Sequence, residues 1–280
     1  MVVSVARLII SSDFSVLADR NQLDNPPLAI LRSLAVILNK TRIMKNKTFL
    51  LTLILLIFIG CAEKSNFKAL TAQSSDLKGQ IKSLTEKRYS AQLIDGTIQE
   101  VKEKHTGKIE IKKFFDKENR LEKSKYFGEN GNLHSIVKIR VDHSYYYLGS
   151  EGFDDTNKLI FEDKVTKSTE NSFIVERFNV NSNTLVQSEM VYDKNRLCTL
   201  LKTQINDSTS IAWEYKRDES GRILYTNTIN KFGQQVDTSL LFAKYLDFDH
   251  KGNWTKRIDY KKGQEDKVYV FERIIEYPEK

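Results

Sequence analysis

The chain has 280 residues, of which 44 are Lys or Arg and 37 are Asp or Glu, so its net charge is +7. Residues 1–61 hold seven of the basic and three of the acidic residues, which leaves +3 for the rest of the chain with the two signs interspersed. A nucleic-acid partner requires a concentrated basic face, so this composition argues against one.

Residues 1–43 precede an internal methionine, Met44, at which translation can start. They contain one moderately apolar stretch, residues 28–38, which Arg32 interrupts, and Met44 follows. Signal peptides begin at the N-terminus, so Met44 is predicted to be the true initiator. Residues 1–43 would then be a non-native or disordered leader. The alternative is a genuine cytoplasmic extension.

Residues 44–60 have the layout of a signal peptide. Lys45 and Lys47 precede 13 uncharged residues, 48–60, and Cys61 follows directly after Gly60. Thirteen residues are too few to cross a bilayer, which takes roughly 20, but they suit the apolar region of a signal peptide. The segment resembles the lipobox of bacterial lipoproteins, with Phe58 where Leu is usual, and this implies lipidation of Cys61. An uncleaved anchor or a buried apolar strand is the alternative.

The lipobox resemblance also implies a location. Ala62, not Asp, follows the cysteine, as in lipoproteins destined for the outer membrane. We therefore expect a lipid-anchored protein of the cell envelope, in the periplasm or at the cell surface. Residues 61–75 are polar, and we expect a flexible tether there. A domain of residues 76–280 should begin with a first strand over residues 80–89.

A turn motif recurs through residues 115–254. Each copy has an aromatic residue, then usually Asp or another small polar residue, then Gly or Asn, and finally an apolar anchor. The anchors are Leu121, Leu133, Leu159, Leu185, Leu197, Ile223 and Trp254. Asp or Asn would close each turn with its side chain, while Gly or Asn would supply positive φ.

The spacing of the anchors indicates stacked hairpins. Successive anchors are one or two repeat lengths apart, the last interval being slightly longer, and the repeat length is roughly 13 residues, as in stacked supersecondary units. Because a single strand separates them, turns one repeat length apart should lie at opposite edges of a sheet. Turns two repeat lengths apart should lie at the same edge.

The repeat resembles the YD/RHS-type repeats of bacterial surface proteins and, more loosely, MORN-like repeats. Residues 248–277 are similar to the C-terminal hairpins of Bacteroidetes lipoproteins. The expected fold is all-β: an open, twisted antiparallel meander of hairpins after a helical or disordered signal segment.

No constellation typical of an active site stands out. The four histidines show no metal-ligand spacing, and the acidic pairs Asp154-Asp155 and Glu162-Asp163 lack the alternation of a calcium loop. Cys198 lies in an apolar run and is expected to be a buried small hydrophobe. The sequence therefore predicts no catalytic residue, no metal, no cofactor and no enzyme activity. Carboxylates contributed by distant strands keep an enzyme acting on envelope polymers as an alternative.

The aromatic run Tyr145-Tyr146-Tyr147 is the candidate binding surface, because successive side chains of a strand point to opposite faces. One face would then be exposed to a protein or glycan partner, unless a curled sheet buries both. Trp213 and Trp254 are expected to be core residues. The leading functional hypothesis is a membrane-anchored, non-catalytic β-repeat binding module. A toxin-neutralising or immunity-like envelope protein is the alternative implied by the repeat resemblance.

Overall fold

The structure, a computed structural model, describes residues 65–101 and 109–279. Within these ranges it contains fifteen β-strands, one 3-10 turn, η2 (Gln73–Ser75), and no α-helix. The strands are β1 (Ser83–Ile94), β2 (Thr97–Glu100), β3 (Ile109–Phe115), β4 (Leu121–Phe127), β5 (Leu133–Val141), β6 (Tyr147–Asp154), β7 (Leu159–Ser168), β8 (Ser172–Asn179), β9 (Thr184–Tyr192), β10 (Cys198–Asn206), β11 (Thr209–Arg217), β12 (Ile223–Phe232), β13 (Gln235–Phe248), β14 (Trp254–Lys261) and β15 (Gln264–Glu276). The predicted all-β class is confirmed, and the predicted first strand corresponds to β1.

The sheet closes on itself, so the prediction of an open meander is wrong. From β3 to β15 each strand pairs antiparallel with the next, and β1 pairs with β3 on one side and β15 on the other. The β1–β15 register runs from Ser83↔Glu276 to Gln92↔Lys267. β2 pairs with the end of β1 and adds a hairpin outside the ring of fourteen strands. Closure satisfies the backbone groups that the two edge strands of an open sheet would expose.

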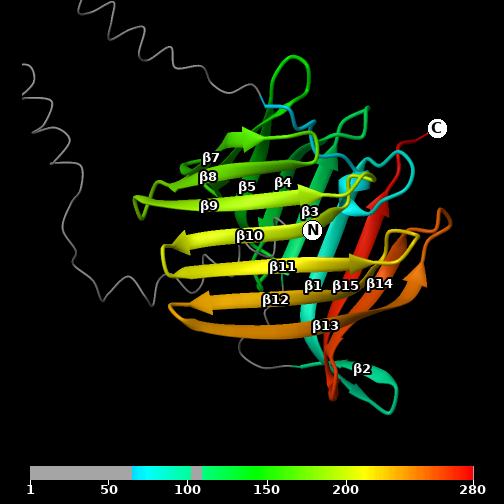
Figure 1. Cartoon of the computed structure of the whole chain (residues 1–280). Helices are drawn as coiled ribbons and strands as arrows, with labels where there is room; N and C mark the ends of the chain where they lie inside the picture. The colour runs from blue at the N-terminus through cyan, green and yellow to red at the C-terminus, as the bar shows by residue number, and fades with distance from the viewer. Residues whose placement is uncertain (1–64, 102–108, 280) are drawn as a thin grey trace, which may run out of the picture. The chain divides into compact units, whose positions relative to one another are not determined.

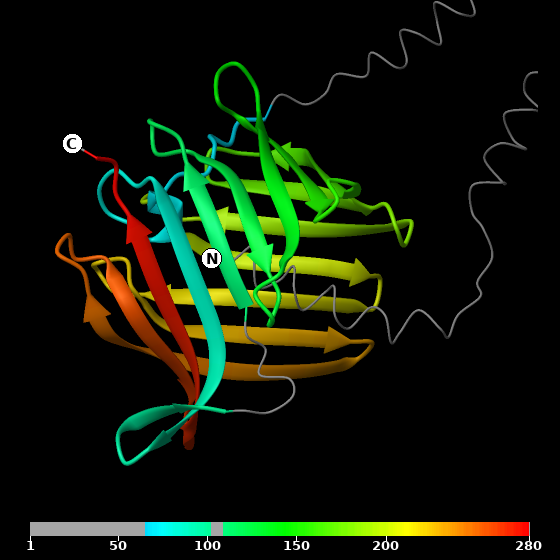
Figure 2. The ribbon, with the colours of Figure 1, turned by 180° about the vertical axis from the view of Figure 1, so that it is seen from behind.

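The barrel has two walls whose strands run in different directions. Figure 1 shows β8–β13 side by side across the near wall, with β1 and β15 crossing behind them. Figure 2, the view from behind, shows β1 (cyan) directly beside β15 (red). The first and last strands of the domain therefore form the middle of one wall.

The turns form as the repeat predicts, except that Arg196, and not Asn195, has positive φ in the turn at residues 193–197. In five of the seven copies an aspartate Oδ1 accepts hydrogen bonds from the backbone N–H groups two and four residues later, as Asp154 does from Thr156 (3.0 Å) and Lys158 (2.9 Å). The five aspartates are Asp116, Asp154, Asp193, Asp218 and Asp249. In each of these turns the residue three after the aspartate has positive φ: Asn119, Asn157, Arg196, Gly221 and Gly252.

The spacing of the copies also predicts the end of the barrel at which each turn lies. Strand order places the turns at residues 116–120, 193–197, 218–222 and 249–253 at one end, here called the plug end. The turns at residues 128–132, 154–158 and 180–183 lie at the opposite, far end, as do the β12–β13 and β14–β15 turns. Turns one repeat length apart lie at opposite ends, and turns two repeat lengths apart lie at the same end, as expected.

Residues 65–81, here called the plug segment, pack against the plug end. Phe67 is 0% exposed, and its ring centroid lies 4.5 Å from that of Phe173 and 4.9 Å from that of Tyr192. The backbone carbonyls of Phe67 and Leu70 accept hydrogen bonds from the N–H groups of Tyr147 (2.8 Å) and Leu121 (2.7 Å). The expectation of a flexible tether is therefore wrong for residues 65–75, while residues 61–64 lie outside the described ranges.

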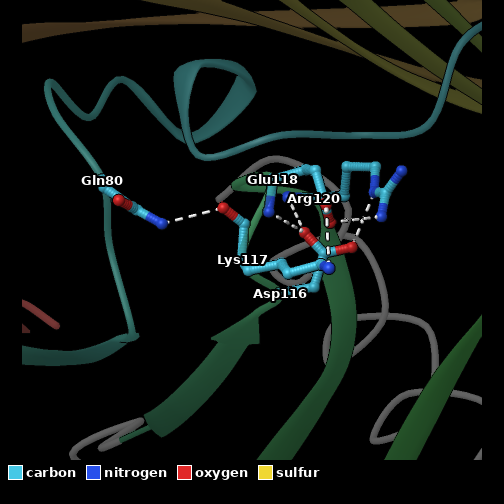
Figure 3. Close-up of polar contacts among 5 residues, drawn as sticks. All are labelled: Gln80, Asp116, Lys117, Glu118 and Arg120. Atoms are coloured by element: carbon cyan, nitrogen blue, oxygen red, sulfur yellow. Dashed lines mark hydrogen bonds and ion pairs between the residues drawn. The ribbon is translucent and has the colours of Figure 1, made fainter.

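Side chains of the turns fix the second half of the plug segment. Asn119 Oδ1 accepts the N–H of Ile81 at 2.8 Å, and its Nδ2 donates to the carbonyl of Gly79 at 2.7 Å. Asn253 Oδ1 accepts the N–H of Lys78 at 2.6 Å, and its Nδ2 donates to the carbonyl of Lys78 at 3.1 Å. Figure 3 shows Gln80 donating to the carbonyl of Lys117, inside the turn that the Asp116–Arg120 pair closes. The repeat turns thus serve two purposes, because they reverse the chain and also hold the plug segment.

Burial of the inward-facing side chains differs between the two ends. Leu84, beside the plug segment, is 0% exposed, and Phe271, near the middle of β15, is 4% exposed. Tyr269 lies one inward position farther toward the far end and is 38% exposed. The interior is therefore covered at the plug end and reaches solvent at the far end.

Candidate functional site

Five charged side chains face the interior from three adjacent strands. They are Glu86 and Arg88 of β1, Arg257 and Asp259 of β14, and Arg273 of β15, here called the charged cluster. The register aligns them in rows, since Glu86 pairs with Arg273, Arg88 with Phe271, and Phe271 with Arg257. Directly paired residues of neighbouring strands lie on the same face of a sheet, so the five side chains share one patch of the interior wall.

Arg273 makes three contacts in the part of the charged cluster that lies nearest the plug segment. Its Nε donates to Glu86 Oε2 at 3.0 Å, its Nη2 donates to the carbonyl of Ser75 at 3.1 Å, and its guanidinium lies 3.5 Å from the Trp254 ring centroid. Burial raises the pKa of Glu86, but the charges of Arg273 and Lys113 outweigh it and hold that pKa at about 2. Glu86 is therefore ionised in the folded protein, and the ion pair fastens η2 of the plug segment to the barrel wall.

The second ion pair joins neighbours on β14. Arg257 Nε lies 2.8 Å from Asp259 Oδ1, and Arg257 Nη2 donates to Asp259 Oδ2 at 3.0 Å. Burial raises the pKa of Asp259 above its usual value although Arg257 opposes this change, and Arg257 is itself only 1% exposed. A buried carboxylate persists where a paired and hydrogen-bonded cation balances it.

Arg88 has a different environment from the other two arginines. Among the described residues, its guanidinium makes no ion pair within 4.0 Å; it lies 4.7 Å from the ring centroid of Tyr269 and 5.6 Å from that of Phe271. Burial lowers the pKa of Arg88 from its usual value. An arginine retains its proton even so, so the cluster holds three cations against two carboxylates.

The arginines of this arrangement offer N–H donors to a negative group. Glu86 and Asp259 are each engaged by an arginine, and the hydroxyls of Tyr215 and Tyr245 have pKa values that burial raises. Guanidinium groups offer a planar set of N–H donors that matches carboxylate and phosphate oxygens. Among the described residues, no group of three or more His, Cys, Asp or Glu side chains is placed to hold a metal ion.

A second network, on the other wall, joins Arg177, Asp163 and Ser150. Arg177 donates to both oxygens of Asp163 at 2.7 and 2.8 Å, and Ser150 Oγ donates to Asp163 Oδ2 at 2.6 Å. Arg177 also lies 3.9 Å from the ring centroid of Phe161. This network ties β6, β7 and β8 together and has the character of a structural ion pair.

The predicted site residues do not form a single surface. Cys61 lies outside the described ranges. Tyr145 is exposed, Tyr146 is half-buried with Lys68 Nζ 4.0 Å from its ring centroid, and Tyr147 is buried against Phe173. The prediction that these rings alternate along a strand is wrong, because Tyr145 and Tyr146 belong to a turn in which Asp142 Oδ1 accepts the N–H groups of Ser144 and Tyr146.

Other expectations agree with the structure. Trp213 and Trp254 are buried core residues, and Cys198 is a buried free thiol whose pKa burial raises to about 12. Within the described part of the chain, no helix has the length and apolar character that crossing a membrane requires.

Sequence inspection missed the charged cluster, although a local signal exists. Glu86 and Arg88, like Arg257 and Asp259, are opposite charges two residues apart within a strand, and residues two apart share one face. What hides the signal is that the outer face of the same strands is charged as well, as with Lys87 of β1 and Glu272 of β15.

Comparisons with known proteins leave the family open. No family model matches the chain, and no curated protein does. Solved structures similar to it include a porin-like protein from Bacteroides uniformis, with a TM-score of 0.42 and 8% identity over 71% of this chain and 99% of that one. A LolA superfamily protein from Nitrosomonas europaea has a TM-score of 0.28 and 9% identity over 76% of this chain and 96% of that one. The resemblance to YD/RHS-type and MORN-like repeats stays a prediction.

Proposed function

We propose that the protein is a lipid-anchored lipoprotein of the cell envelope whose barrel acts as a non-catalytic binding module. In this arrangement the plug end faces the membrane and the far end faces away from it. The observation that carries the proposal is the position of the plug segment, which begins only four residues after Cys61 in the sequence.

The length of the connection sets the orientation. Four residues span at most about 14 Å when fully extended, so an acylated Cys61 would hold Ser65 close to the bilayer. Ser65 and Phe67 are buried at the plug end. The far end, at which the interior reaches solvent, would then point away from the bilayer and be available to a ligand or partner.

Metabolic labelling with a palmitate analogue tests the anchor. The full-length chain, produced in a bacterium that processes lipoproteins, should incorporate the label, and the Cys61→Ala variant should incorporate none. Cys198→Ala is the matched control, because it removes the other cysteine of the chain and should leave labelling unchanged. Label that persists in Cys61→Ala would refute the anchor.

Fluorescence quenching by spin-labelled lipids tests the orientation. In a Cys198→Ala background, single cysteines would replace Lys194, in an exposed turn at the plug end, or Lys262, in an exposed turn at the far end. In vesicles carrying the acylated protein, a dye at position 194 should be quenched strongly. A dye at position 262 should be quenched weakly, because a strand of about ten residues separates the ends by about 33 Å. Equal quenching at both positions would contradict the orientation.

A further inference from the structure

Arg88 differs from the other two arginines of the charged cluster because, among the described residues, no carboxylate oxygen lies within ion-pair distance of its guanidinium. Arg257 and Arg273 each have a carboxylate oxygen within 3.0 Å. Among the described residues, Arg88 has only the faces of Tyr269 and Phe271. A cation–π contact contributes roughly 0.5–2 kcal/mol, which is less than the several kcal/mol that withdrawing a charge from water costs.

The surroundings of Arg88 on the far-end side are basic as well as apolar. By strand alternation, Lys267 of β15 and Lys261 of β14 follow Tyr269 and Asp259 on the inward face, and both lysines are exposed. Two acidic residues lie farther out on the same face, Asp237 of β13 and, by the same alternation as Lys267, Glu265 of β15. Exposed cations at the approach to a partly buried arginine would raise the local concentration of anions.

Apolar side chains occupy the same approach. Tyr269 presents 38% of its surface to solvent. Leu241 and Ala243 of β13 are half-buried on the same face two strands away, since Ala243 pairs with Asp259 and Asp259 pairs with Tyr269. Binding sites for small organic molecules combine apolar walls with a few placed polar groups. The wall between the far end and Arg88 has that composition.

We propose that Arg88 is the anion-binding residue of a ligand site inside the barrel, and that the ligand is an organic anion with a carboxylate or phosphate group on an apolar body. The anionic group pairs with the Arg88 guanidinium, and the apolar body lies against Tyr269 and Leu241. This ligand class rests on the proposed binding role, but it does not depend on the lipid anchor.

Isothermal titration calorimetry tests the site with the chain as purified from the cell, placed in phosphatidylcholine nanodiscs if it carries a lipid. The probes are 1-naphthoate, 1-naphthyl phosphate, the neutral 1-naphthalenemethanol and inorganic phosphate. At least one of the two aromatic anions should bind at least tenfold more tightly than the neutral alcohol, and the stronger of the two identifies the head group as carboxylate or phosphate. Inorganic phosphate should bind at least tenfold more weakly than the better aromatic anion, because it lacks the apolar body.

Substitutions assign the binding to Arg88. Arg88→Gln should lower the affinity for the better-binding anion at least tenfold. Arg88→Lys should lower that affinity several-fold, because a point charge replaces the planar set of donors. Arg222→Gln, an exposed arginine at the plug end, should leave affinity unchanged. If Arg88→Gln fails to fold, the comparison of affinity between wild type and Arg88→Lys tests the site.

Three results would overturn the site: no binding of either anion at millimolar concentration, equal binding by wild type and the Arg88 variants, or inorganic phosphate binding as tightly as the aromatic anions. A wild-type chain that takes up no palmitate label, or label that persists in Cys61→Ala, would refute the anchor and leave this test standing.

Discussion

Replacing Arg273 with methionine is expected to lower the free energy of unfolding by about 3–5 kcal/mol, the usual cost of removing one partner of a buried ion pair. Methionine retains much of the side-chain volume but donates no hydrogen bond. The variant would leave Glu86, which is 4% exposed, without the Nε donor, and the carbonyl of Ser75 without the Nη2 donor. Equilibrium urea unfolding of the full-length chain measures the loss.

The matched control is Arg222→Met, which removes the exposed Arg222–Asp218 pair and should cost less than about 1 kcal/mol. Adding Glu86→Gln to Arg273→Met should recover part of the loss, because the unpaired charge is then gone. Losses of equal size for Arg273→Met and Arg222→Met would show that the buried pair contributes no more than a surface one.

Acid titration is an independent measure of how much the Glu86–Arg273 pair contributes to stability. The pKa of Glu86 is about 2 in the folded protein against an ordinary value of 4.5. A depressed folded pKa means that this group stabilises the fold above pH 4.5 and that the contribution is lost as the pH falls from 4.5 to 2. Arg273→Met should reduce the slope of stability against pH across that window.

The repeat turns could be predicted because their chemistry is local. Five consecutive residues contain the aspartate that accepts two backbone N–H groups and the residue with positive φ, as in Asp249 and Gly252. The turn at residues 142–146 has the same hydrogen bonds but does not match the motif. Tyr145 occupies its positive-φ position with φ 61°, where Asn or Gly is the usual choice, and the Arg120 guanidinium lies 3.5 Å from its ring centroid.

Closure of the barrel could not be predicted from a motif of this kind. Ser83 of the first strand pairs with Glu276 of the last, and pairing between the two ends of a domain depends on how twist accumulates over all the intervening strands. The hairpins between them have the same sequence pattern whether the sheet is open or closed. The interior charged cluster was hidden for the same reason, since only closure makes one face of β1 and β15 an interior.

The plug segment escapes sequence prediction because the spacing of its apolar residues is typical of a structure that it does not form. Phe67, Leu70, Leu77 and Ile81 are all buried and lie three, seven and four residues apart, as on one face of a helix, yet the segment has only the 3-10 turn η2. Their burial comes from contacts with the barrel end, not from regular structure of their own. Composition alone therefore cannot distinguish a tether from a segment of this type.

Replacing Phe67 with alanine is expected to release the first half of the plug segment. Phe67 is 0% exposed and packs against Phe173, Tyr192 and the Arg196 guanidinium, 4.0 Å from its ring centroid. Truncating a buried phenylalanine costs about 3–5 kcal/mol, and here the loss falls on a segment joined to the barrel mainly by backbone hydrogen bonds. Amide hydrogen exchange at Tyr147 and Leu121, whose N–H groups donate to the plug segment, should accelerate by two or more orders of magnitude.

Phe178→Ala is the matched control, because the same truncation is made at a ring that is 42% exposed, on β8 at the far end. It should cost less than about 1 kcal/mol and leave exchange at Tyr147 and Leu121 unchanged. Unaltered exchange in Phe67→Ala would mean that the turns at Asn119 and Asn253 hold the segment without the aromatic contact. Faster exchange would instead show that the least stable part of the domain lies directly beside the proposed membrane anchor. A lipid at Cys61 would then hold the barrel through Phe67, and the Phe67→Ala variant should lose the difference in quenching between positions 194 and 262.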